Sequence, residues 1–182
     1  MKYFTQFKHS WKLLAGIAVL VAIAFAFFFP VGHPSVNASW QQATTLLDRQ
    51  FISTVIHANY QPGEGELALD ENSLWVRVIP GRDRRHPLYI FDFRTQGLCG
   101  EVGCLYAIYT PRQQRVFSGL LDAPLSEESA FEGVRRYSQE GFPCLRINQP
   151  QSQRVQVSNL YCYQGAQLVR INHSLMARNP SE

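Results

Sequence analysis

Hydrophobic positions divide the chain into one long apolar segment, two helix-like stretches and a series of short alternating stretches. Residues 13–29 carry no charge, and every lysine precedes them, at Lys2, Lys8 and Lys12. As a helix this segment is about 26 Å long at ~1.5 Å per residue, and extension to residue 31 brings it near the ~30 Å hydrocarbon core of a bilayer. A basic flank before an apolar segment predicts that the amino terminus stays cytoplasmic while the following residues are exported.

Two fates of the apolar segment 13–31 are compatible with its sequence. It is longer than the roughly 7–15-residue apolar part of a cleavable signal, which favours retention as a membrane anchor. Val36 and Ala38, however, are small residues with the spacing that a signal peptidase recognises. We therefore expect residues 1–38 to act as a signal anchor, with cleavage and release as the alternative. Residues 39–178 then form one extracytoplasmic domain, and residues 179–182 form a flexible tail.

Two stretches of the exported part have helical periodicity. In the first, apolar residues recur every three or four positions from Trp40 to Ala58, and Ser39 with Gln42 suits a capping box. Gln61-Pro62-Gly63 ends this helix near residue 59. The second expected helix is Glu127–Ser138, with Ser126 as its cap and acidic residues in its first turn.

The remaining elements are expected to be strands. Their apolar residues alternate or run in short blocks between turn residues. The segments are 74–79, 88–94, 105–110, 115–121, 145–148, 155–163 and 168–172. Alternation places Tyr89, Phe91 and Phe93 on one face, and Gln164-Gly165 suits a tight hairpin turn. Short connections between successive strands predict an α+β fold, with a mostly antiparallel sheet and two packing helices on one face.

Charge argues against a nucleic-acid partner. The 17 basic residues comprise the three lysines before residue 13 and 14 arginines after it, and these arginines balance 14 acidic residues. Nucleic-acid binding needs a concentrated basic surface, which an electrically balanced domain does not supply. No motif for a cofactor is present, and no reaction signature such as G-x-S-x-G or H-E-x-x-H occurs.

The four cysteines of the exported part are expected to form disulfides, because extracytoplasmic compartments oxidise thiols. Cys99 and Cys104 flank a turn with two glycines, which permits a local bridge. We therefore favour the pairs Cys99–Cys104 and Cys144–Cys162 among the three connectivities. Zinc is the competing interpretation, but a C-x4-C pair with two remote cysteines is a poor ligand pattern, so no metal site is expected.

The segment from Phe91-Asp92-Phe93 to Leu98-Cys99-Gly100-Glu101-Val102-Gly103-Cys104-Leu105-Tyr106 resembles a motif of uncharacterised exported bacterial proteins, particularly cyanobacterial ones. In these proteins a C-G-x-x-G-C turn joins two strands. The likeness covers about twenty residues. It implies a membrane-anchored extracytoplasmic domain and brings no catalytic residue.

Candidate binding residues lie in two turns. Arg82, Arg84 and Arg85 lie in the connection 81–86 between two expected strands, where guanidinium groups suit phosphate or carboxylate ligands. Glu101 lies in the glycine turn between the first two cysteines, and a turn can present a carboxylate to a ligand. The alternative interpretation is that both turns are solvated connections without a ligand. Asp92 and Arg94 share a predicted strand face, which favours an ion pair over a catalytic carboxylate.

Three function classes follow from these features. The first is a membrane-tethered, non-catalytic domain that binds or scaffolds another envelope component, in the periplasm or a lumen. Its partner would be an envelope protein, a cell-wall polymer or an anionic lipid. The second is a secreted inhibitor or small-ligand binder, released after signal cleavage. The third is an envelope hydrolase, for which no catalytic residue can be named.

Overall fold

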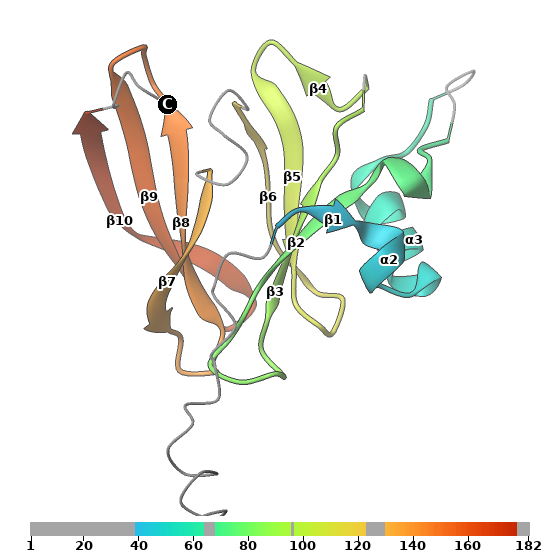
Figure 1. Ribbon diagram of the computed structural model, residues 1–182, viewed down its shortest axis with the longest axis horizontal. Helices are drawn as coiled ribbons and strands as arrows, with labels where there is room; N and C mark the ends of the chain where they lie inside the picture. Colours follow the sequence, from blue (N-terminus) through green and yellow to red (C-terminus); the bar gives the residue numbers. More distant parts are fainter. Residues whose placement is uncertain (1–38, 64–67, 96, 123–129, 178–182) are drawn as a thin grey trace, which may run out of the picture. The chain divides into compact units, whose positions relative to one another are not determined.

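The computed structural model describes residues 39–63, 68–95, 97–122 and 130–177 (Figure 1). The expected export segment 1–38 and tail 179–182 lie outside these residues. Within the described ranges, no helix is long and apolar enough to cross a membrane.

Two antiparallel sheets make up most of the described domain (Figure 1). The first contains β1 (Gln41–Gln42), β2 (Trp75–Ile79), β3 (Leu88–Asp92), β4 (Cys99–Gly100), β5 (Gly103–Tyr109) and β6 (Arg115–Leu121). Its order is β1-β2-β3-β5-β4, in which β3 and β4 pair with different parts of β5. Strand β6 also pairs with β5. The second is a meander of β7 (Phe131–Tyr137), β8 (Pro143–Pro150), β9 (Val155–Gln164) and β10 (Gln167–Ala177).

Strand alternation in the first sheet separates two hydrophobic clusters. Ile90 faces the second sheet and belongs to a cluster with Leu145 and Ile147 of β8. Phe91 faces the opposite side, where it packs with Ile52 and Val55 of the helix α3 (Arg49–Asn59). The expected face of Tyr89, Phe91 and Phe93 is confirmed, because all three join this second cluster. The first sheet is therefore covered by the second sheet on one face and by α3 on the other.

The predicted α+β class with two packing helices is wrong, although the antiparallel pairing is as expected. The second predicted helix, Glu127–Ser138, is the clearest error: residues 131–137 form strand β7. Gly133 disfavours a helix, and Phe131 and Gly133 pair with Ile147 and Leu145 of β8. Phe131 is fully buried between the sheets, so tertiary packing outweighs the local helical pattern. Residues 127–129 lie outside the described part.

The first predicted helix begins later than expected. The 39–48 segment forms β1, then a single turn of helix, α2 (Ala43–Leu46), before an extended residue at Leu47. Helix α3 starts at Arg49, and the Asp48 carboxylate accepts a 2.8 Å hydrogen bond from the Phe51 amide as its cap. A short 3-10 turn, η1 (Glu71–Ser73), precedes β2. The predicted end near residue 59 agrees with α3.

The predicted strands correspond to β2, β3, β5, β6, β8, β9 and β10, with ends that differ by a few residues. The expected hairpin between β9 and β10 is present, and Gly165 adopts a φ of 66° in its turn. This backbone conformation favours glycine. Strand β10 continues to Ala177, well past the predicted end at residue 172.

Candidate functional site

Four connections between strands meet at one end of the described domain (Figure 1). They join β2 to β3, β5 to β6, β7 to β8, and β9 to β10. Each connection contributes to a cavity of about 700 Å³, which lies within the size range of small-ligand sites. The lining residues are Arg85, His86, Thr110, Pro111, Arg112, Gln114, Glu140, Phe142, Tyr163 and Gly165.

The charged groups of this cavity come from three different connections. Arg85 lies between β2 and β3, Arg112 between β5 and β6, and Glu140 between β7 and β8, and all three are exposed to solvent. Two guanidinium groups and one carboxylate give the cavity a net positive charge. Guanidinium groups bind carboxylate or phosphate oxygens through paired hydrogen bonds, so an anionic group is the ligand that this cavity suits.

Backbone contacts hold the β2–β3 connection, which carries the three predicted arginines, against the β7–β8 connection. The Arg82 amide donates a 2.9 Å hydrogen bond to the Gly141 carbonyl between β7 and β8. Gly81 has no room for a side chain, because a Cβ there would collide with the His86 carbonyl. Gly141 has a φ of 94°, which favours glycine. The connection is therefore held against the neighbouring one, with its arginine side chains in solvent.

Asp83 organises the turn that carries Arg85. Its Oδ1 accepts a 2.7 Å hydrogen bond from the Arg85 amide and lies 2.8 Å from His86 Nδ1. These two hydrogen bonds, the Arg85 amide first, lower the pKa of the Asp83 carboxyl. The carboxylate is therefore used within the turn, where the nearby Arg85 charge also lowers its pKa.

The three predicted arginines have different positions. Arg85 lines the cavity. Arg82 lies with its guanidinium carbon 5.8 Å from the centre of the Tyr137 ring, a cation–π distance. Arg84 is exposed and is not among the lining residues.

Aromatic rings and amide hydrogen bonds form the base of the cavity. The His86 ring meets Phe142 edge-on at 5.1 Å, and the Phe142 centroid lies 4.5 Å from that of Tyr163. The Tyr163 hydroxyl donates to the Gly165 carbonyl at 3.1 Å. The Gln114 side-chain amide donates to the Ala166 carbonyl at 3.2 Å, which joins the β5–β6 connection to the β9–β10 turn. These contacts hold the four connections together.

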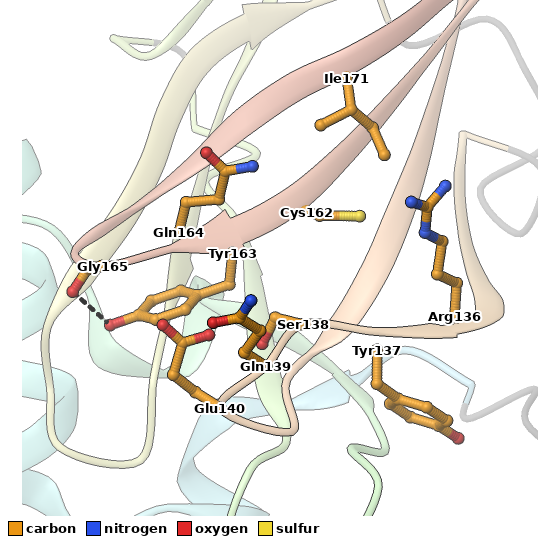
Figure 2. A pocket seen from close by; sticks show the side chains of 10 residues that line it. All are labelled: Arg136, Tyr137, Ser138, Gln139, Glu140, Cys162, Tyr163, Gln164, Gly165 and Ile171. Carbon is orange, nitrogen blue, oxygen red and sulfur yellow. Dashed lines mark hydrogen bonds between the residues drawn. The ribbon is translucent and has the colours of Figure 1, made fainter.

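A second cavity of about 470 Å³ adjoins the first and shares Glu140, Tyr163 and Gly165 with it (Figure 2). Arg136 lies on the far side of this cavity from Glu140, and Cys162 forms part of its base (Figure 2). Hydrogen bonds from its own amide, from the Ser138 hydroxyl and from the Gly165 amide lower the pKa of Glu140. Glu140 is therefore an anion at neutral pH, placed between the two cavities.

Glu101 does not join the predicted arginines. It is an exposed residue in the turn between β4 and β5, whereas the β2–β3 connection lies beside the other end of β5. The seven-residue strand β5 separates the two ends by about 20 Å at ~3.3 Å per residue. The two predicted binding turns are therefore separate features.

The two disulfides have the connectivity that the sequence favours. Cys99 pairs with Cys104 across the β4–β5 hairpin, and Cys144 pairs with Cys162 across β8 and β9. No free cysteine remains in the chain, so both pairs form disulfides and no thiolate is left as a zinc ligand. The described residues also contain no cluster of three or more His, Cys, Asp or Glu side chains that could hold a metal. Two disulfides indicate an oxidising, extracytoplasmic location.

Asp92 forms the ion pair that the strand pattern predicts. Its Oδ2 lies 2.7 Å from Arg94 Nε and accepts a 3.2 Å hydrogen bond from the Tyr106 hydroxyl. Burial, and then the Asp92 charge, raise the pKa of Tyr106 to about 12. Asp92 is buried and lines neither of these two cavities.

Sequence reasoning missed three of the charged residues that the structure brings together: Arg112, Arg136 and Glu140. The Thr110-Pro111 step after a strand marks a turn and was the available signal for Arg112. Arg136 lies in the predicted helix Glu127–Ser138, whose residues 131–137 are strand β7, and Glu140 follows that strand. No protein-family model, curated protein or solved structure matches the chain.

Proposed function

We propose that the chain is a membrane-tethered, non-catalytic extracytoplasmic domain that binds an anionic group of another envelope component at its loop end. The observation that carries this proposal is the approach of Arg85 and Arg112, from two separate connections, to one cavity. The other polar residues that line this cavity include Gln114, Thr110, Tyr163 and Glu140. Their amide, hydroxyl and carboxylate groups are suited to holding a ligand.

The export segment and the disulfides support the location. The basic flank and the apolar segment 13–31 favour an amino-terminal anchor, and both disulfides need an oxidising compartment. The likeness of the Cys99–Cys104 turn to those of exported bacterial proteins agrees with this placement. The alternative is a released small-ligand binder, in which the same domain acts after cleavage near Ala38.

Two experiments test the proposal. Protease added outside sealed vesicles of known orientation should digest the domain only from the extracytoplasmic side, and the recovered protein should keep its original amino terminus. A mature amino terminus near Ser39 would instead establish the released form.

Binding is tested on matrices bearing carboxylate or phosphate groups. The Arg85→Ala/Arg112→Ala variant should lose retention, whereas Arg154→Ala should keep it. Arg154 is a matched control because it is an exposed arginine between β8 and β9, at the other end of β8 from the cavity. Equal retention of both variants and the wild type would refute the binding role of the loop end.

A further inference from the structure

The amino-terminal strand shows at which end the chain enters the domain. Strand β1 pairs antiparallel with β2, and Gln41 lies opposite Val76. Followed back from Gln41 to Ser39, the chain therefore runs beside β2 towards Ile79 and the β2–β3 connection. That connection belongs to the loop end, the end of the domain where the connections 80–87, 110–114, 138–142 and 165–166 meet. Strand β10 leads away from this end, so Ala177 lies at the opposite one.

In the anchored form that we propose, this chain direction keeps the loop end near the bilayer. Seven residues, 32–38, separate the expected membrane segment 13–31 from Ser39. A chain of seven residues spans at most about 25 Å at ~3.6 Å per residue, which is less than the ~30 Å thickness of the hydrocarbon core. The end of the domain that the chain enters is therefore the end within reach of lipid headgroups.

Charge distinguishes the two ends of the domain. The exposed arginines of the loop-end connections are Arg82, Arg84, Arg85 and Arg112. Among the described residues, only two acidic side chains lie in these connections, Asp83 and Glu140. At the opposite end, the connections 93–98, 101–102 and 151–154 carry Arg94, Glu101 and Arg154, and Asp122 follows β6. The Arg94 guanidinium is paired with Asp92, so an anionic surface is attracted more strongly to the loop end.

An exposed aromatic ring lies beside these arginines. Tyr137, the last residue of β7, is 39% exposed, and the guanidinium carbon of Arg82 lies 5.8 Å from its ring centre. Tyrosine is enriched at the level of lipid headgroups, where its ring meets the acyl chains and its hydroxyl meets water. Guanidinium groups bind phosphate oxygens through paired hydrogen bonds. The loop end therefore carries both kinds of side chain that a headgroup layer favours.

We propose that the loop end docks on the anionic phospholipid headgroups of the membrane that anchors the chain. Arg84, Arg85 and Arg112 bind headgroup phosphates, and the Tyr137 ring lies in the interface. This inference rests on the proposed function and identifies its anionic partner as lipid. Docking in this orientation leaves the opposite end, with Glu101, facing away from the bilayer.

Arginine modification by phenylglyoxal, followed residue by residue by mass spectrometry, tests the docking on the full chain in lipid nanodiscs. Discs of phosphatidylcholine are compared with discs that also contain phosphatidylglycerol. In the mixed discs at low salt, Arg84 and Arg112 should react at least about fivefold more slowly, the factor that corresponds to one basic residue at an anionic surface. Arg154 should react equally in both discs, and high salt should remove the difference at the loop end.

Two variants separate the loop end from the rest of the domain. Arg84→Ala/Arg112→Ala should reduce the protection of Arg85 by phosphatidylglycerol, because two of its neighbouring phosphate contacts are lost. Arg154→Ala, which removes an exposed arginine from the opposite end, should leave that protection unchanged. The comparison of the two discs with the wild type does not depend on the folding of either variant.

Equal reaction rates in the two kinds of disc, or a slowing of Arg154 as large as that of Arg112, would overturn the docking inference. It would also fail if dissolved glycerol phosphate protected the loop-end arginines in phosphatidylcholine discs as well as phosphatidylglycerol does, because the loop end would then bind small phosphates. In each of these cases the proposed function stands if Arg85→Ala/Arg112→Ala still abolishes retention on the anionic matrices. Absence of both protection and retention would remove both proposals.

Discussion

The disulfide between Cys144 and Cys162 should be the larger of the two covalent contributions to stability. It joins residues 18 apart in the sequence, whereas the other joins residues only 5 apart. In the chain-entropy description, closing these loops restricts the unfolded chain by about 3 kcal/mol and about 2 kcal/mol, respectively. Replacement of Cys144 and Cys162 by alanine should therefore lower the free energy of unfolding by about 1 kcal/mol more than the Cys99→Ala/Cys104→Ala change.

The position of the two bridges widens this difference. Cys144 and Cys162 are both buried in the second sheet, so alanine also removes buried sulfur atoms from packed surroundings. Cys99 and Cys104 are half-buried in a peripheral hairpin. Removal of the Cys99–Cys104 bridge should therefore leave both sheets and both hydrophobic clusters intact.

Guanidinium unfolding followed by circular dichroism measures both effects, with wild type in reductant as a third sample. If the two bridges act independently, reductant should lower the free energy of unfolding of the wild type by about 5 kcal/mol, the sum of the two loop-closure contributions. The reasoning would be refuted if replacing Cys99 and Cys104 lowered the free energy of unfolding as much as, or more than, replacing Cys144 and Cys162. So would a wild type insensitive to reductant under conditions where mass spectrometry finds all thiols reduced.

Three further results are expected. The pKa of Tyr106 is raised to about 12, so its contribution to stability is complete below pH 10 and is lost as the pH rises from 10 towards 12; Tyr106→Phe should flatten this part of the unfolding-versus-pH curve. Gly81→Ala should destabilise the β2–β3 connection, because its Cβ collides with the His86 carbonyl, and should lower the thermal midpoint in a melting experiment. Phe131→Ala should cost about 3–5 kcal/mol in denaturant unfolding, since Phe131 is fully buried between the sheets; a loss below ~1 kcal/mol would contradict its place in that core.

Local patterns predicted the first sheet well. Alternation in Leu88–Asp92 places Ile90 and Phe91 on opposite faces, and both faces are buried, one by a sheet and one by a helix. Paired cysteines flanking a glycine turn likewise defined one disulfide without knowledge of the fold. These features depend on residues that are neighbours in sequence, so the chain alone contains the needed information.

Features that depend on partners distant in sequence were not predictable in the same way. Phe131–Tyr137 has helical spacing of apolar residues, and its strand conformation comes from pairing with β8. The predicted start of the first helix near Ser39 is too early for a similar reason. The Ala43 amide donates to the Leu74 carbonyl, so contact with the segment before β2 holds this part of the chain out of a continuous helix.

The end of the domain that carries the two cavities shows why a charge cluster in sequence is a weak guide to a site. Arg82, Arg84 and Arg85 are adjacent in the chain, yet one contacts an aromatic ring, one faces solvent and one lines a cavity. The cation that shares the cavity with Arg85 is Arg112, in a connection that the antiparallel pairing of β3 with β5 carries to the same end. Convergence of separate connections, rather than local density of charge, produces the two-arginine cavity. On the proposed binding role, a substitution that loosens the Arg82–Gly141 contact should weaken retention on the anionic matrices although Arg85 and Arg112 both remain.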